Sequence, residues 1–183
     1  PSSKNKKVLA RAKELEEVNP MMGHRGVRLG ITYPEIYEMQ IKAVFEATAK
    51  LVKKKINAKP QIMIPQVGSI EELNHIKSIY DNVKSDMEKK YKIKFKINFG
   101  TMLEVVRACL TSNEIAKTAE FFSFGTNDLT QGVFSFSRED AESKFLEEYM
   151  KKEILETSPF QSIDESGVGD LMDIGISRGR KIK

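Results

Sequence analysis

The sequence contains one cysteine and no tryptophan among its 183 residues. A single cysteine, Cys109, excludes an internal disulfide, so an apolar core and hydrogen bonds have to hold the fold. No apolar run approaches the roughly 20 residues of a membrane-spanning helix, and the charged opening PSSKNKKVLARAKELEE lacks the apolar stretch of a secretory signal. These absences predict a cytoplasmic protein with no membrane partner, with organellar targeting of a full-length protein as the open alternative.

The charge balance is close to even, with 30 Lys and Arg residues against 26 Asp and Glu residues and a net charge of +4. Lysines concentrate in residues 50–59 and 89–96, at or beside the ends of predicted helices, where the helix dipole favours cations. A nucleic-acid surface would call for aromatic residues between the cations or a recognisable binding motif. Neither is present, so we predict a solvated face and no nucleic-acid partner.

Three stretches repeat one order, in which an apolar strand leads through a polar turn to a helix. QIMIPQVG precedes a long helix that Ser69 and Glu72 open at capping-box spacing. KFKINFGTMLE precedes a short helix beginning at Thr111, and FFSFGTNDL, whose apolar half predicts a strand buried on both faces, precedes helices at 139–156 and 168–180. This alternation predicts parallel strands joined by right-handed crossovers.

Residues 19–29 form a candidate further strand ahead of a helix opened by Pro34, which brings the count to about four βα units. A closed (β/α)8 barrel usually needs about 250 residues. The fold class is therefore α/β, either about half of a TIM barrel or a small open sheet. No low-complexity linker interrupts residues 1–183, so we predict no internal domain boundary.

Two acids, Glu104 and Asp128, end successive predicted strands. The carboxyl ends of parallel strands meet at one edge of a sheet, and neighbouring strands lie about 4.8 Å apart. Both carboxylates could therefore reach one point, where a divalent cation such as Mg²⁺ would remove their mutual repulsion. The alternative is structural, with Glu104 capping the following helix and Asp128 ordering its turn.

Two glycine-containing strings could bind anions. The successive backbone N–H groups of Gly125-Thr126-Asn127-Asp128 could form an anion-binding concavity, although an ordinary turn would have the same sequence. GHRGVRLG places Arg25 and Arg28 between glycines, which suits phosphate or carboxylate oxygens but is equally compatible with a surface arginine pair. Cys109 has apolar neighbours and no base in view, so we predict that it packs in the core.

The strings NPMMGHRGVRLG, IMIPQVGS, FGTMLE and FFSFGTNDLTQ, in this order and spacing, resemble the phosphoenolpyruvate-utilising enzymes. RACLTSNEIAKTAEFFSFGTNDLTQ and FSREDAESKFLEEYMKKEI are similar to the branch that interconverts ATP, phosphate and pyruvate with AMP, diphosphate and phosphoenolpyruvate. Phosphoenolpyruvate synthase and enzyme I of the bacterial sugar phosphotransferase system share the shorter strings and are the alternatives within the family. A non-catalytic module that associates through open sheet edges is the alternative from another class. The likeness runs from about Val8 to Arg180.

The resemblance implies part of a C-terminal (β/α)8 barrel that binds pyruvate or phosphoenolpyruvate. It implies that Glu104 and Asp128 bind Mg²⁺ and that Arg25 grips the phosphoryl group. It also implies a substrate site around the substrate carboxylate, lined by Gly125, Thr126, Asn127 and Asp128. The implied partners are pyruvate or phosphoenolpyruvate, a phosphohistidine domain of the same full-length protein, and a second copy in a homodimer.

The family's proton-transferring cysteine stands in a Cys-Gly-Glu-His-Gly-Gly segment, and this sequence ends at GRKIK before that segment. Cys109 does not match the motif. We therefore identify no certain catalytic residue in this chain and expect the chain alone to be inactive.

Overall fold

A small parallel sheet forms the centre of the fold. The computed structural model describes residues 3–183, with side chains described from Asn5 on. The strands are β1 (Gln61–Ile64), β2 (Asn98–Leu103) and β3 (Phe122–Phe124), paired in parallel in the order β1-β2-β3. Met63 lies opposite Gly100, and Met102 lies opposite Ser123. The predicted α/β class with parallel pairing is confirmed.

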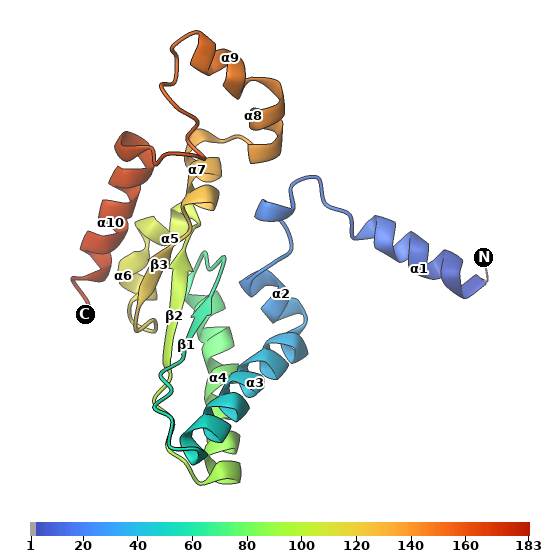
Figure 1. Ribbon diagram of the computed structural model, residues 1–183, viewed down its shortest axis with the longest axis vertical. Helices are drawn as coiled ribbons and strands as arrows, with labels where there is room; N and C mark the ends of the chain where they lie inside the picture. Colours follow the sequence, from blue (N-terminus) through green and yellow to red (C-terminus); the bar gives the residue numbers. More distant parts are fainter. Residues whose placement is uncertain (1–2) are drawn as a thin grey trace.

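Helices make up most of the rest of the described chain (Figure 1). Those ahead of β2 are α1 (Ser3–Glu14), α2 (Val27–Thr32), α3 (Pro34–Lys53) and α4 (Ile70–Tyr91), with a 3-10 turn at Pro20–Met22. After β2 come α5 (Val106–Leu110), α6 (Ser112–Ile115), α7 (Thr126–Phe134), α8 (Arg138–Lys144), α9 (Leu146–Lys151), a π-helical turn at Glu165–Gly169, and α10 (Asp170–Gly179).

Alternate residues of the strands face the helices. Phe99 of β2 packs against Tyr80 of α4, with ring centroids 5.0 Å apart. Leu103 and Phe124 lie against Gly175 of α10, where a Cβ would come within about 3.5 Å of both side chains. Since α4 contacts α3 and α6, and α6 contacts α10, these helices follow one another along the helix-covered face of the sheet.

The opposite face of the sheet has less cover. Ser123 Oγ lies 2.7 Å from Met63 Sδ on this face. Met63 is 37% exposed, whereas Ile62 and Ile64, which point to the helices, are 9% and 2% exposed. Figure 1 places α7, α8 and α9 beyond the end of β3, so these three helices gather at the carboxyl edge of the sheet.

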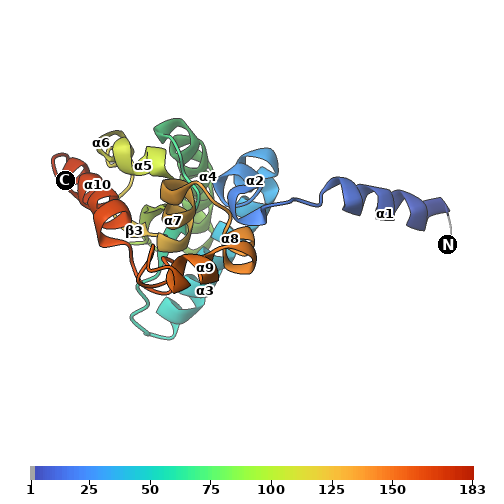
Figure 2. The same ribbon diagram turned by 90° about the horizontal axis from the view of Figure 1, so that it is seen from above.

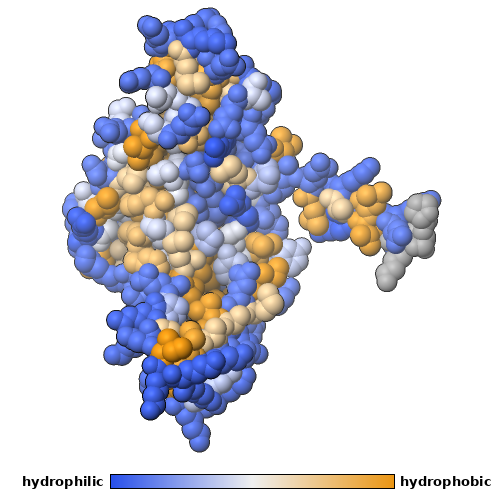
Figure 3. Space-filling view, viewed as in Figure 1, coloured by the Kyte–Doolittle hydropathy of each residue, from blue (hydrophilic) through white to orange (hydrophobic). Residues whose placement is uncertain are grey.

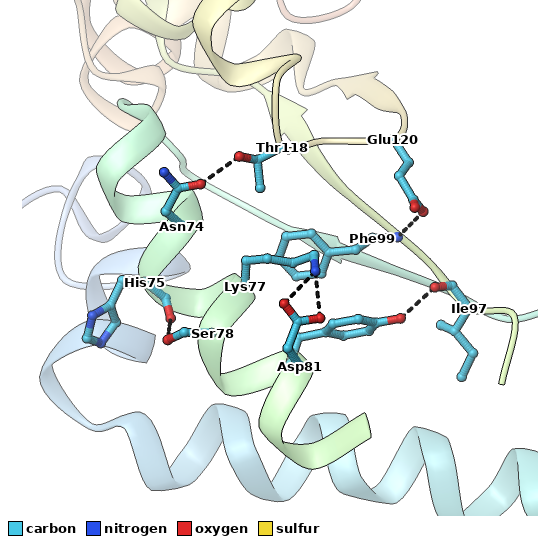
Figure 4. Close-up of polar contacts among 10 residues, drawn as sticks. Asn74, His75, Lys77, Ser78, Asp81, Ile97, Phe99, Thr118 and Glu120 are labelled. Atoms are coloured by element: carbon cyan, nitrogen blue, oxygen red, sulfur yellow. Dashed lines mark hydrogen bonds and ion pairs between the residues drawn. The ribbon is translucent and has the colours of Figure 1, made fainter. Parts of the chain in front are cut away.

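Helix α4 begins where the sequence predicts. The Ser69 side chain accepts a hydrogen bond from the Glu72 N–H, and the Glu72 carboxylate accepts from the Ser69 N–H, which confirms the capping box. The buried residues of the helix recur every three or four positions: Leu73, Ile76, Tyr80, Val83 and Met87. Polar contacts tie α4 and the loop before β3 to the sheet region, including Thr118 to Asn74 and the Phe99 N–H to Glu120 (Figure 4).

The candidate strand at residues 19–29 is wrong, and three strands are present within residues 3–183 in place of about four βα units. Gly26 has a φ of +58° and precedes helix α2. The Val27 N–H donates to the Pro65 carbonyl at 3.0 Å, which fixes the start of this helix beside the end of β1. The buried residues Val27 and Gly30 are three positions apart, which is a helical spacing. The apolar content of this segment alone does not distinguish a helix from a strand.

Strand β3 and the helices that follow it differ from the prediction. Strand β3 is only partly buried along its length, because Phe122 and Phe124 line a pocket beside α10 instead of being fully covered by it. The helix expected at 139–156 is divided into α8 and α9 at Phe145, whose φ of −142° leaves the helical region and whose ring packs on Phe136 and Tyr149. The helix expected from Val168 begins at Asp170, after the π-helical turn.

The first helix extends away from the rest of the molecule in both ribbon views (Figures 1 and 2). Apolar side chains lie on its surface (Figure 3), among them Val8 and Leu9, which are 63% and 59% exposed. Within residues 3–183, no helix combines the length and the apolar character needed to cross a membrane.

The lysine-rich ranges are solvated, as predicted. The lysines in residues 50–59 and 89–96 are exposed, and they lie around the end of α3 and the end of α4. Figure 3 shows hydrophilic side chains over this lower end of the molecule. Several of these lysines pair locally, for example Lys90 with Glu46 at 3.0 Å and Lys94 with Glu88 at 2.7 Å.

Candidate functional site

Glu104 is a buried acid at the carboxyl end of β2. It directly follows Leu103, the last residue of the strand, and is 5% exposed. Its Oε1 accepts a hydrogen bond from the main-chain N–H of Gln66 at 2.5 Å. Gln66 lies two residues past the end of β1, so the carboxyl ends of two neighbouring parallel strands supply the two groups.

Asp128 comes to the same point from the segment after β3. It is the third residue of α7, and its Oδ1 accepts a hydrogen bond from Gln66 Nε2 at 3.3 Å. Gln66 is itself 3% exposed and contacts both carboxylates, one with its backbone and one with its side chain. The structure therefore brings together the two acids that the sequence places at successive strand ends.

The surroundings of Glu104 disfavour its ionised form. Burial, together with the nearby Asp128 carboxylate, raises the pKa of Glu104 from 4.5 to about 7. The N–H of Gln66 and the positive charge of Arg25 act in the opposite direction and favour the ionised form of Glu104. Holding both carboxylates ionised near neutral pH is therefore costly in the chain alone, and a bound divalent cation would offset that cost.

A pocket of about 270 Å³ adjoins the carboxylates. Its lining includes Glu104, Asp128, Gln66 and Arg28, with Met22 of the loop before α2. This volume is enough for a hydrated ion together with a small organic acid, since one water takes up about 30 Å³ in the liquid. The size of the pocket therefore suits a small ligand rather than a large cofactor.

The donors in this pocket fit Mg²⁺. The described residues contain no group of three or more His, Cys, Asp or Glu side chains that could hold a metal ion. Zinc normally requires three or four such ligands, whereas Mg²⁺ commonly takes one or two carboxylates and completes its shell with water and substrate oxygens. Glu104 and Asp128 match the second pattern.

The string Gly125-Thr126-Asn127-Asp128 is the start of a helix rather than a free turn. Gly125 precedes α7, and the first main-chain bond of the helix runs from the Leu129 N–H to the Gly125 carbonyl at 3.0 Å. The N–H groups of the first turn, in Thr126, Asn127 and Asp128, thus have no acceptor within the helix and lie at the positive end of its dipole. This arrangement favours an anion beside the two acids.

Gly125 is required by close packing against Glu104. A Cβ at position 125 would come within 2.5 Å of Glu104 Oε2 and within 2.9 Å of Met102 Sδ. A side chain there would displace the carboxylate. The neighbouring Asn127 is exposed, and its Oδ1 accepts a hydrogen bond from Arg138 Nη1 at 3.4 Å.

The two candidate arginines differ in their contacts. Arg28 Nη1 donates to the carbonyl oxygens of Met22 and Gly23, at 2.7 and 2.8 Å, so this guanidinium mainly holds its own loop. Arg25 is exposed, and its charge acts on Glu104. Among the described side chains, no hydrogen bond or ion pair engages the Arg25 guanidinium, which leaves it available to a ligand.

Gln66 is the site residue that the sequence analysis missed. The available signal was its position, because it is a polar residue just past a buried strand, as Glu104 and Asp128 are. Cys109, by contrast, behaves as predicted. It is fully buried, and burial raises the pKa of its thiol to about 11.

The sequence of this chain is similar to a known protein family and to individual known proteins. Residues 2–182 match the sequence family described as PEP-utilising enzyme, PEP-binding domain, where PEP is phosphoenolpyruvate. Similar proteins include "Pyruvate, phosphate dikinase" of Entamoeba histolytica, 53% identical over 96% of this chain, and "Pyruvate, phosphate dikinase" of Clostridium symbiosum, 48% identical over 96% of it. The chain spans about a fifth of the length of these curated relatives, 20% of each. With nearly its whole length matched, this chain belongs to the PEP-binding domain family of the PEP-utilising enzymes.

Proposed function

We propose that this chain is the part of a pyruvate, phosphate dikinase that binds Mg²⁺ and forms part of the pyruvate and phosphoenolpyruvate site. The full protein would interconvert ATP, phosphate and pyruvate with AMP, diphosphate and phosphoenolpyruvate. The observation that carries the proposal is the Glu104–Gln66–Asp128 arrangement, in which two acids and a buried amide converge at the carboxyl edge of a parallel sheet. The similarity to dikinases over 96% of the chain supports the choice of enzyme.

The architecture that we propose is part of a (β/α)8 barrel, with residues 1–183 as one piece of that C-terminal domain. Two features support it. The strands are parallel and in sequence order, and α4, α6 and α10 follow one another along one face of the sheet. In such barrels the active site lies at the carboxyl ends of the strands, which is where Glu104 and Asp128 lie in this chain.

In this proposal each site residue has a physical task. Glu104 and Asp128 bind Mg²⁺ through their carboxylate oxygens. Gln66 donates a hydrogen bond to one oxygen of each carboxylate. When bound, Mg²⁺ would supply positive charge to offset the negative charge that collects on the substrate oxygens during the reaction. Arg25, whose guanidinium is exposed, contacts the phosphoryl group as it is transferred.

The start of α7 would bind the substrate carboxylate. The N–H groups of Thr126 and Asn127 point out of the helix end, and Gly125 lets the ligand and Glu104 approach closely. The donor of the phosphoryl group would be a phosphohistidine domain of the full-length protein, and that protein would form a homodimer.

Calorimetric titration with oxalate, a stable mimic of the pyruvate enolate, tests this function. We expect the chain to bind oxalate only with Mg²⁺ present, and Glu104→Gln and Asp128→Asn each to abolish binding. Asp173→Asn, which alters an exposed acid on α10, is the matched control and should bind as the unmodified chain does. Oxalate binding that needs no Mg²⁺, or that survives in both site variants, would refute the proposed function.

A further inference from the structure

Gln66 combines features that a loop residue seldom shows together. It is uncharged and polar, yet 3% exposed, and its backbone has a φ of +63°. A residue other than glycine in this left-handed region costs about 1–3 kcal/mol, and such strain persists only where the surrounding structure imposes it. Strained residues of this kind cluster at functional sites, so we expect Gln66 to do more than connect β1 to α4.

Neighbouring groups hold this strained conformation from two sides. The Pro65 carbonyl, just before Gln66, accepts from the Val27 N–H at 3.0 Å, which fixes the chain on the side of α2. Gly26 lies directly against the side chain, because a Cβ on Gly26 would come within 2.7 Å of the Gln66 Cβ. The loop before α2 therefore packs directly against Gln66 where this residue lines the pocket, and only a glycine at position 26 allows so close an approach.

We propose that Gln66 is a positioning residue for the two metal-binding carboxylates. Its main-chain N–H fixes Oε1 of Glu104 at 2.5 Å, and its side-chain amide fixes Oδ1 of Asp128 at 3.3 Å. One residue thereby sets the separation of two acids that come from different elements of the fold. The inference rests on the proposed Mg²⁺ site and adds the residue that shapes it.

The chemistry of an amide suits this task. Both hydrogen bonds use N–H donors, which orient a carboxylate and leave its second oxygen for another partner. An amide carries no net charge, so it does not cancel the negative charge that attracts a cation, as a lysine or arginine at the same place would. Hydrogen bonds to the ligands of a metal typically change its affinity 10- to 100-fold when they are removed.

A titration with Mn²⁺, followed by electron paramagnetic resonance, tests the role of Gln66 without requiring catalysis. Gln66→Leu keeps a side chain of similar size and the backbone N–H but removes the amide. We expect this variant to bind Mn²⁺ tenfold or more weakly than the unmodified chain and to give an altered spectrum of the bound ion. Gln61→Leu is the matched control, because Gln61 is an exposed glutamine at the opposite end of β1.

Urea unfolding of the metal-free variants separates positioning from general stability. We expect Gln66→Leu to unfold at the same urea concentration as the unmodified chain. Equal Mn²⁺ affinity and spectrum in Gln66→Leu would overturn the role of Gln66 and leave the metal site standing. A loss of affinity matched by a loss of metal-free stability would show a purely structural residue and would also overturn it. Absence of Mn²⁺ binding in the unmodified chain would overturn the metal site and the role of Gln66 together.

Discussion

The raised pKa of Glu104 predicts an unusual dependence of stability on pH. An ordinary surface acid titrates near pH 4.5, whereas burial, with the Asp128 carboxylate nearby, raises the pKa of Glu104 to about 7. Between these two values the folded chain holds a proton on Glu104 that the unfolded chain has released. Stability must therefore fall as the pH rises through this window, because deprotonation favours the unfolded state.

The size of the effect follows from the two pKa values. Each pH unit between them contributes about 1.4 kcal/mol, so the titration of Glu104 lowers the free energy of unfolding by at most about 3–4 kcal/mol between its unfolded and folded pKa. The stability that protonated Glu104 retains is fully present below pH 4.5 and is lost as the pH rises to 7. In small domains the whole free energy of unfolding is only about 5–15 kcal/mol, so a change of this size is readily measured.

Urea unfolding at a series of pH values, in the absence of metal, measures this contribution. Other groups titrate over the same range, so the comparison is between the unmodified chain and Glu104→Gln, which keeps the shape and the acceptor for the Gln66 N–H. The variant should gain stability relative to the unmodified chain as the pH rises from 4.5 to 7. Identical pH profiles for the two proteins would refute the argument that Glu104 is held in a costly buried state.

Three further predictions concern single residues. Gly125→Ala should cost about 1–3 kcal/mol of stability in urea and weaken Mg²⁺ binding in calorimetry, because the new Cβ meets the Glu104 carboxylate at 2.5 Å; unchanged binding would contradict the close packing. Ser69→Ala should cost about 1 kcal/mol in urea, because the Glu72 N–H loses its acceptor at the start of α4, and an unchanged midpoint would show that the capping box contributes little. Cys109 should resist a thiol reagent in the folded chain and react in urea, since its thiol is fully buried with a pKa of about 11; rapid labelling without denaturant would contradict this burial.

Local patterns predicted the parts of the fold that depend on neighbouring residues in the sequence. The capping box at Ser69 and the three- or four-residue spacing of buried positions placed α4, because a helix makes its contacts within one or two turns. The position of Glu104 and Asp128 at successive strand ends was equally local information. This information was enough to predict that the two acids lie close together, because parallel strands end at a common edge.

Contacts between distant residues account for what the sequence did not show. The segment at 19–29 is not a strand because Gly26 takes a positive φ and Val27 bonds to Pro65, nearly 40 residues further along. Gln66 contacts acids that are 38 and 62 residues away, and its left-handed backbone has no mark in the sequence. The partial exposure of β3 likewise depends on how α10, about 50 residues further along, packs beside Phe122 and Phe124.

The central claim is that Glu104 and Asp128 together hold a divalent cation at which the substrate binds. The most direct measurement is electron paramagnetic resonance of Mn²⁺ added to the chain, with oxalate labelled with a magnetic oxygen isotope. We predict one bound Mn²⁺ per chain whose spectrum is broadened by the labelled oxalate, and no bound ion in Glu104→Gln or Asp128→Asn. Bound Mn²⁺ that persists in both variants, or a spectrum that labelled oxalate leaves unchanged, would contradict it.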